Sequence, residues 1–175
     1  MPSSATTVSP DGLSISHSKT DKYQCISTSK PLPSRLDRFY FEVTLKSTAI
    51  SASSPSPAWP TVSIGFCTAA GAPVTFPGAK PRPAASSVRS WGYHGDGGGF
   101  FSSESGGRPP MFGPQCCKGN TVGCGVDLLT HTMWFTLNGW FKWDIFENVH
   151  GRLFPLIGLY DEIELETNFV GPYLW

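Results

Sequence analysis

Apolar and polar side chains alternate in several short stretches of this chain, and this period of two limits its fold more than any other feature. In RFYFEVTL (38–45), Phe39, Phe41, Val43 and Leu45 fall on one side of an extended segment. Successive side chains of a β-strand point to opposite faces, so such a segment covers a core with one face of a sheet. Further strands are predicted at TVSIGF (61–66), TVGCGVDLL (121–129), TMWFTL (132–137), LFPLIGLY (153–160) and EIELETNF (162–169).

Turn-forming residues separate these predicted strands. The chain contains 19 glycines and 16 prolines, which interrupt it often, and it has almost no helical periodicity. Asn138-Gly139 directly follows one strand, and this dipeptide tolerates the positive φ angles of a type I′ hairpin turn. Ser47 to Pro60 is rich in serine and proline, so we expect an exposed loop that carries Trp59. Short strands between turns predict an all-β protein, specifically a β-sandwich.

The length of 175 residues fits one domain. The first ten residues are rich in Ser, Thr and Pro and offer few groups for a core. We therefore expect a flexible N-terminal tail over residues 1–10 and a folded domain over residues 11–175.

Charge and cysteine content restrict the partners and the compartment. Thirteen basic residues balance thirteen acidic ones, so no long-range field would attract nucleic acid or an anionic membrane, and neither is expected as a partner. MPSSATTVSP at the N-terminus lacks the basic start and apolar run of a signal peptide. Five cysteines are an odd number in a chain large enough not to need disulfides. We expect free thiols and a location in the cytoplasm or the nucleus.

The glycine-rich stretch WGYHGDGGGFF (91–101) raises the question of a phosphate-binding or catalytic loop. A P-loop requires a lysine and a hydroxyl directly after its last glycine, but Gly99 is followed by Phe100 and Phe101. His94, Asp96 and the following serines could supply an acid, a base and a nucleophile, yet no G-x-S-x-G nucleophile turn is present. We interpret the stretch as a hairpin and predict no catalytic residue.

A metal site is not predicted either. Cys116, Cys117, Cys124 and His131 lie within sixteen residues, but adjacent cysteines cannot easily both face one tetrahedral ion, and no C-x-x-C pair occurs. Cys67 and Cys124 occupy positions predicted to face the core, where a thiol behaves as a small apolar group. No cofactor is expected.

The order of these segments resembles the SPRY domain. The resemblance runs through RFYFEVTL, TVSIGF, SWGYHGDGGGFF, KGNTVGCGVDLLTHTMWFTLNGW and LFPLIGLYDEIELETNF, and so covers roughly residues 11 to 173. Its most specific part is GNTVGCGVDLLTHTMWFTLNG (119–139), which is similar to two paired strands and the asparagine-glycine hairpin of that family. Within the family, YHGDGGGFFSS (93–103) is most similar to the Ran-binding protein M branch, which includes scaffold subunits of the GID/CTLH ubiquitin ligase.

This resemblance implies a bent antiparallel two-sheet sandwich of the concanavalin-like jelly-roll type, without a catalytic site, that binds protein or linear peptide partners through loops at one rim. In SPRY domains the partner surface includes the strand after the SWG hairpin and the turn after the PLIGLY strand. The corresponding residues here are Phe101, Ser102, Leu159, Tyr160 and Asp161. The segment from His17 to Lys22 lines the same rim in relatives. Tyr160 is the strongest candidate, because a tyrosine at a strand end presents a rigid face and a polar tip.

Two other functions are compatible with a β-sandwich. A carbohydrate-binding module would stack a sugar on an exposed tryptophan, for which Trp59, Trp140 and Trp143 are candidates. A secreted SPRY effector, as in plant parasites, would require a signal peptide upstream of these residues.

Overall fold

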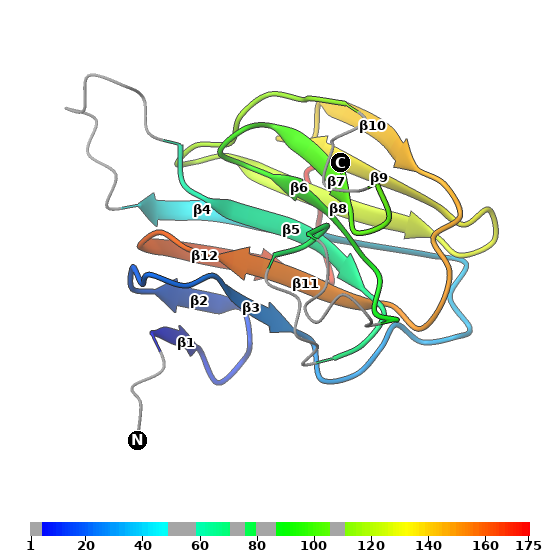
Figure 1. The fold of residues 1–175 in the computed structure, drawn as a ribbon, viewed down its shortest axis with the longest axis horizontal. Helices are drawn as coiled ribbons and strands as arrows, with labels where there is room; N and C mark the ends of the chain where they lie inside the picture. The colour runs from blue at the N-terminus through cyan, green and yellow to red at the C-terminus, as the bar shows by residue number, and fades with distance from the viewer. Residues whose placement is uncertain (1–4, 49–58, 71–75, 80–86, 106–110) are drawn as a thin grey trace.

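The computed structural model describes residues 5–48, 59–70, 76–79, 87–105 and 111–175, and in these ranges it contains β-strands and no α-helix. No described segment therefore forms a helix that could cross a membrane. All strand pairings are antiparallel, and the strands form two sheets (Figure 1). This is the all-β sandwich that the alternating pattern predicted.

The larger sheet has seven strands. In spatial order they are β1 (Thr6–Val8), β2 (Ser14–His17), β12 (Ile163–Asn168), β4 (Arg38–Thr48), β8 (Thr121–Asp127), β9 (Thr132–Leu137) and β10 (Phe141–Phe146). The smaller sheet has five strands. In spatial order they are β3 (Gln24–Ser27), β11 (Phe154–Leu159), β5 (Val62–Cys67), β6 (Ser90–His94) and β7 (Gly99–Ser102). Chain crossovers between the sheets bring β12 and β4 together in one sheet, and β11 and β5 together in the other.

The predicted strands and turns are found at the expected places. Strand β9 ends at Leu137, and Asn138 and Gly139 have φ angles of 51° and 71°. The Trp140 N–H donates to the Leu137 carbonyl at 3.1 Å, which closes the type I′ turn. The stretch WGYHGDGGGFF forms the β6–β7 hairpin, in which His94 pairs with Gly99.

The N-terminal boundary differs from the prediction. Residues Thr6–Val8 form β1 and pair with β2, with Thr6 opposite His17 and Val8 opposite Ile15, so ordered structure begins before Asp11. Strand β3 was not predicted either. Strands β1, β2 and β3 are three or four residues long and carry few apolar side chains, so their structure depends on the pairing of β1 with β2, of β2 with β12 and of β3 with β11, and not on a local apolar pattern. The loop predicted from Ser47 to Pro60 lies mostly outside the described residues.

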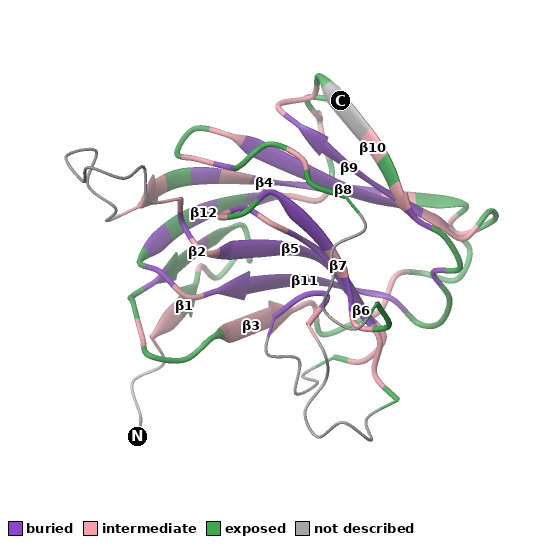
Figure 2. Cartoon of the chain, turned by 45° about the horizontal axis from the view of Figure 1, so that its top comes forward, coloured by how far each residue is buried: buried purple, intermediate pink, exposed green. Residues whose placement is uncertain are grey.

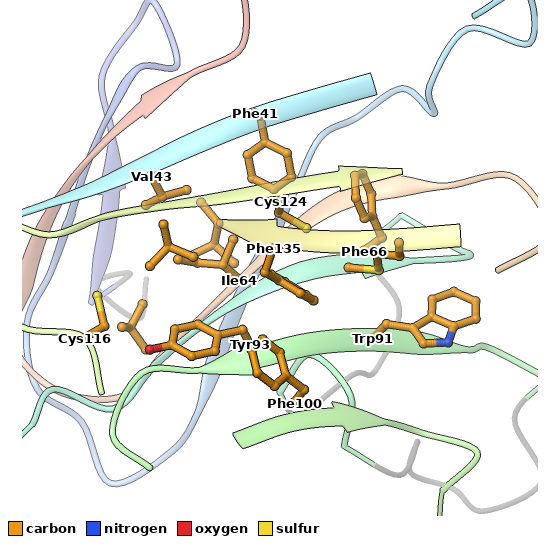
Figure 3. Close-up of a cluster of buried hydrophobic side chains, with 14 of the residues drawn as sticks. Phe41, Val43, Ile64, Phe66, Trp91, Tyr93, Phe100, Cys116, Cys124 and Phe135 are labelled. Atoms are coloured by element: carbon orange, nitrogen blue, oxygen red, sulfur yellow. The ribbon is translucent and has the colours of Figure 1, made fainter. Parts of the chain in front are cut away.

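The core lies between the sheets. Phe41 and Val43 of β4 and Cys124 of β8 face Ile64 and Phe66 of β5, and all five are at most 1% exposed (Figure 3). Phe41 and Phe66 meet edge to face with ring centroids 5.6 Å apart, a favourable aromatic geometry. Strands β5 and β11 are buried along their whole length (Figure 2). In β12 the side chains of Glu164 and Glu166 are exposed, so this face of the strand is solvated.

Strand β8 is buried on both faces, although the alternation predicted only one buried face. Its second face carries Gly123 and Gly125, and the rings of Tyr40 and Trp134 occupy the space that side chains would fill there. The C-terminal residues cover these rings. Trp175 packs on Tyr40 and Trp134 with centroid distances of 5.2 and 5.6 Å. The Leu174 N–H donates to the buried Glu42 carboxylate at 2.9 Å.

Candidate partner-binding surface

Five rings form a continuous aromatic row on the five-stranded sheet. They follow one another in the order Tyr160, Tyr23, Phe76, His94 and Phe101. Successive ring centroids are 4.8, 4.9, 4.8 and 4.2 Å apart. Each contact is close enough for a favourable aromatic pair, so the five rings pack as one row, in which Phe76 is buried and the other four rings are at least partly exposed.

The β6–β7 hairpin supplies one end of this aromatic row. Because side chains alternate across a strand, Tyr93 and Phe100 point into the core while His94 and Phe101 point to the opposite face. The Phe101 ring lies over Gly99, where a Cβ atom would come within 2.5 Å of it. Gly99 therefore leaves room for the Phe101 ring, which is inclined by 30° to the His94 ring.

The segment Phe76–Ala79 supplies the middle of the row by crossing the outer face of the smaller sheet. Glycines on the sheet leave room for this segment. A Cβ atom at Gly158 would lie 2.6 Å from the Phe76 ring, and one at Gly92 would lie 2.5 Å from Pro77. His94 Nε2 is 2.7 Å from the Pro77 carbonyl oxygen and donates to it. Burial lowers the pKa of His94, while the Pro77 carbonyl and Asp96 oppose this. The ring is consequently neutral near pH 7.

The turn after β11 supplies the other end. Tyr160 is partly exposed and packs against Tyr23, which is 51% exposed. Asp161 is buried beside them and accepts a hydrogen bond from the Thr61 N–H at 2.8 Å. Its other oxygen is 3.4 Å from Lys19 Nζ. The carboxylate thus fastens the turn to two neighbouring segments.

The five residues predicted to contact a partner divide into two groups. Phe101 and Tyr160 lie at the two ends of the aromatic row and are partly exposed. Leu159 is fully buried, so its side chain contributes to the core and not to a contact surface. Ser102 and Asp161 are also buried, and both accept hydrogen bonds from neighbouring backbone N–H groups.

Sequence reasoning missed Tyr23 and Phe76. The expectation that residues 17–22 approach this surface places Tyr23 one position beyond the predicted segment, and Lys19 within it contacts Asp161. Phe76 lies in the irregular sequence FPGA, which has no periodicity to reveal that it packs on a sheet. The signal available for it was the pair of glycines opposite, Gly92 and Gly158.

His17 is buried and lies near the Tyr160 backbone and Asp161. Its Nδ1 is 2.7 Å from Thr6 Oγ1, so the N-terminal strand β1 holds this ring. Burial lowers the pKa of His17, and the Tyr160 carbonyl and the Asp161 carboxylate partly offset this effect.

The cysteines considered as metal ligands do not form a metal site in the described part of the chain. All five cysteines are free thiols, and burial raises the pKa of Cys25 and of Cys116 to about 12. No group of three or more potential metal ligands occurs among the residues that the structure describes.

The tryptophans considered for sugar binding differ in exposure. Trp140 is 86% exposed, whereas Trp59 and Trp143 are partly buried.

A family model described as the SPRY domain matches residues 38–172. The chain belongs to the SPRY domain family. SPRY domains are in general protein–protein interaction modules and not catalytic domains. A Ran-binding protein M homolog of Arabidopsis thaliana is 29% identical over 161 residues, which cover 90% of this chain and 31% of that protein. Ran-binding protein 9 of Xenopus tropicalis is 30% identical over 87% of this chain and 25% of that protein.

The SPRY domain of human HERC1 has the same fold. Its crystal structure superimposes with a TM-score of 0.72 at 15% sequence identity, covering 97% of this chain and 95% of the solved one. The chain spans about a third to a quarter of the curated relatives named above, so the likeness is to their SPRY region.

Proposed function

We propose that this SPRY domain binds a short peptide segment of a partner protein along the aromatic row. The observation that carries the proposal is the unbroken contact from Tyr160 through Tyr23, Phe76 and His94 to Phe101. The residues carried over from the family, Tyr160 and Phe101, lie at its ends. Aromatic anchors of this kind provide most of the binding free energy at many interfaces.

The test is the affinity of variants for a partner peptide selected from a display library. Tyr160→Ala and Phe101→Ala should each weaken binding about thirtyfold, the effect of losing an anchor worth about 2 kcal/mol. Trp140→Ala is the matched control, since it removes an exposed aromatic ring from the other sheet and should leave the affinity unchanged. Melting temperatures near the parent value are required of every variant. Selected peptides that bind equally well to both row variants would contradict the proposal.

Trp140→Ala also tests the carbohydrate alternative. A loss of glycan binding in this variant, with peptide binding absent from the parent, would favour a sugar-binding module instead.

We further propose that the domain acts in the cytoplasm or the nucleus as the partner-recognition part of a ubiquitin ligase scaffold. The likeness to Ran-binding protein M homologues supports this role. Affinity capture from the source cell, followed by mass spectrometry, should recover ligase subunits with the parent domain. Their recovery at background level would contradict the scaffold role without affecting peptide binding.

A further inference from the structure

The Tyr160 end of the aromatic row presents two tyrosine faces side by side. The rings of Tyr23 and Tyr160 are inclined by 39° at a centroid distance of 4.8 Å, and Tyr23 is also held against Phe76 at 4.9 Å. Neither phenol hydroxyl has a hydrogen-bond partner among the described residues. The pair therefore offers apolar ring surface together with two available O–H donors.

The charged residues around Tyr23 and Tyr160 occur in pairs of opposite sign, so their net charge is zero. Lys19 and Asp161 form an ion pair, and the second Asp161 oxygen already accepts the Thr61 N–H. Asp21 and Lys22, directly before Tyr23, are exposed and opposite in sign. A cluster of one sign, which phosphopeptides or strongly basic peptides require, is thus absent from these neighbours. The chemistry favours an uncharged ligand segment that supplies apolar surface and carbonyl acceptors.

The row already accommodates one prolyl residue of the chain itself. Pro77 lies between Phe76 and Gly78 over Gly92 and Gly158, where any side chain on the sheet would collide with it. Its carbonyl accepts the hydrogen bond from His94 Nε2 at 2.7 Å. This face of the sheet therefore already holds a proline ring whose carbonyl oxygen accepts a hydrogen bond from an aromatic side chain.

We propose that the partner segment is proline-containing and binds in a polyproline II conformation, with a proline ring packed against Tyr23 and Tyr160. Polyproline II segments lack internal hydrogen bonds, so their carbonyl oxygens can accept from the two phenol hydroxyls. They are also extended before binding, which reduces the ordering cost, and they bind aromatic-lined grooves in other domains. This inference rests on the proposed function and specifies its ligand.

Fluorescence anisotropy with a labelled, uncharged peptide of about ten residues, carrying proline at every third position, tests the inference. A matched peptide with alanine in place of proline should bind about tenfold more weakly or worse, because it loses the preorganised conformation and the ring contacts. Tyr160→Phe keeps the ring and removes the donor, so it should weaken binding about fivefold, and Tyr160→Ala about thirtyfold. Trp140→Ala should have no effect.

The outcomes separate this inference from the proposed function. Failure of the proline peptide to bind at millimolar concentration, or equal binding of the alanine peptide, overturns the proline assignment. If peptides selected from an unbiased library lack proline but lose affinity in Tyr160→Ala, the peptide-binding function stands and the ligand class is wrong. If selected peptides contain proline and are weakened by both Tyr160 variants, the inference is supported.

Discussion

At the scale of single residues, glycine determines where aromatic rings can lie on these sheets. Gly123 and Gly125 leave room for Tyr40 and Trp134 on one sheet, and Gly92 and Gly158 leave room for the segment that carries Phe76 on the other. A missing side chain has no hydrophobic signature, so the sequence pattern identified these strands without indicating what covers them. The aromatic surfaces are as much a consequence of these glycines as of the rings themselves.

Gly125→Ala tests this role. The new methyl group would overlap the Trp134 ring, and because Trp134 is packed under Trp175 it has little freedom to move. Overpacking of this kind costs about 1–3 kcal/mol, so the melting temperature should fall by roughly 3–10 °C in a domain of this size. Gly97→Ala is the control, since no atom lies within 4 Å of the position that its methyl group would take. Equal melting temperatures for the two variants would contradict the packing argument.

His17 gives the fold a dependence on pH. Its pKa is lowered from 6.5 by burial, and that of His94 is lowered for the same reason. The unfolded chain takes up protons on these rings as the pH falls through about 6.5, whereas the folded chain resists protonation until lower pH. The free energy of unfolding should therefore decrease as the pH falls below about 6.5.

Urea unfolding at pH 7.5 and at pH 5.5 measures this effect. His17→Gln should lose less stability between the two pH values than the parent does, because it removes one of the two groups. A variant with the same pH dependence as the parent would show that His17 titrates normally.

At the scale of elements, the predictable strands are those whose side chains carry a core pattern. Strands β4, β5, β9, β11 and β12 were each indicated by apolar residues at the expected spacing, and the β9–β10 turn by Asn138-Gly139. Strands β1, β2 and β3 are short and polar, and tertiary pairing determines them. For the same reason, sequence reasoning named Phe101 and Tyr160 of the aromatic row but missed Tyr23 and Phe76, which come from segments without periodicity.

The C-terminal segment is an element without regular structure that stabilises the larger sheet. Trp175→Ala should lower the free energy of unfolding by about 1–2 kcal/mol, because the ring packs on both Tyr40 and Trp134. Val170→Ala, at a side chain that is 90% exposed, should change it by less than about 0.5 kcal/mol. Chemical denaturation of both variants measures the difference. If the two values coincide, the segment does not contribute to the stability of the sheet.

At the scale of the whole molecule, the two sheets have different outer faces. The larger sheet is covered by the chain's own C-terminal residues over Tyr40 and Trp134, while the smaller sheet carries the aromatic row. Burial of Tyr40 raises its pKa, which fits a phenol sealed between sheet and C-terminus. The aromatic row, by contrast, includes Tyr23, which is half exposed. This asymmetry is the reason to expect a partner on the smaller sheet.

Noncovalent packing alone should hold this molecule together, and its redox behaviour tests that. All five cysteines are free, and because burial raises the pKa of Cys25 and Cys116 to about 12, hardly any reactive thiolate exists there at neutral pH. Thermal melting with and without a reducing agent should give the same midpoint, and thiol titration of the unfolded protein should count five groups. A disulfide would contribute about 2–4 kcal/mol, which corresponds to several degrees in a domain of this size. A drop of that size on reduction, with fewer than five titratable thiols, would reveal a disulfide and would argue for the secreted effector over the proposed location in the cytoplasm or the nucleus.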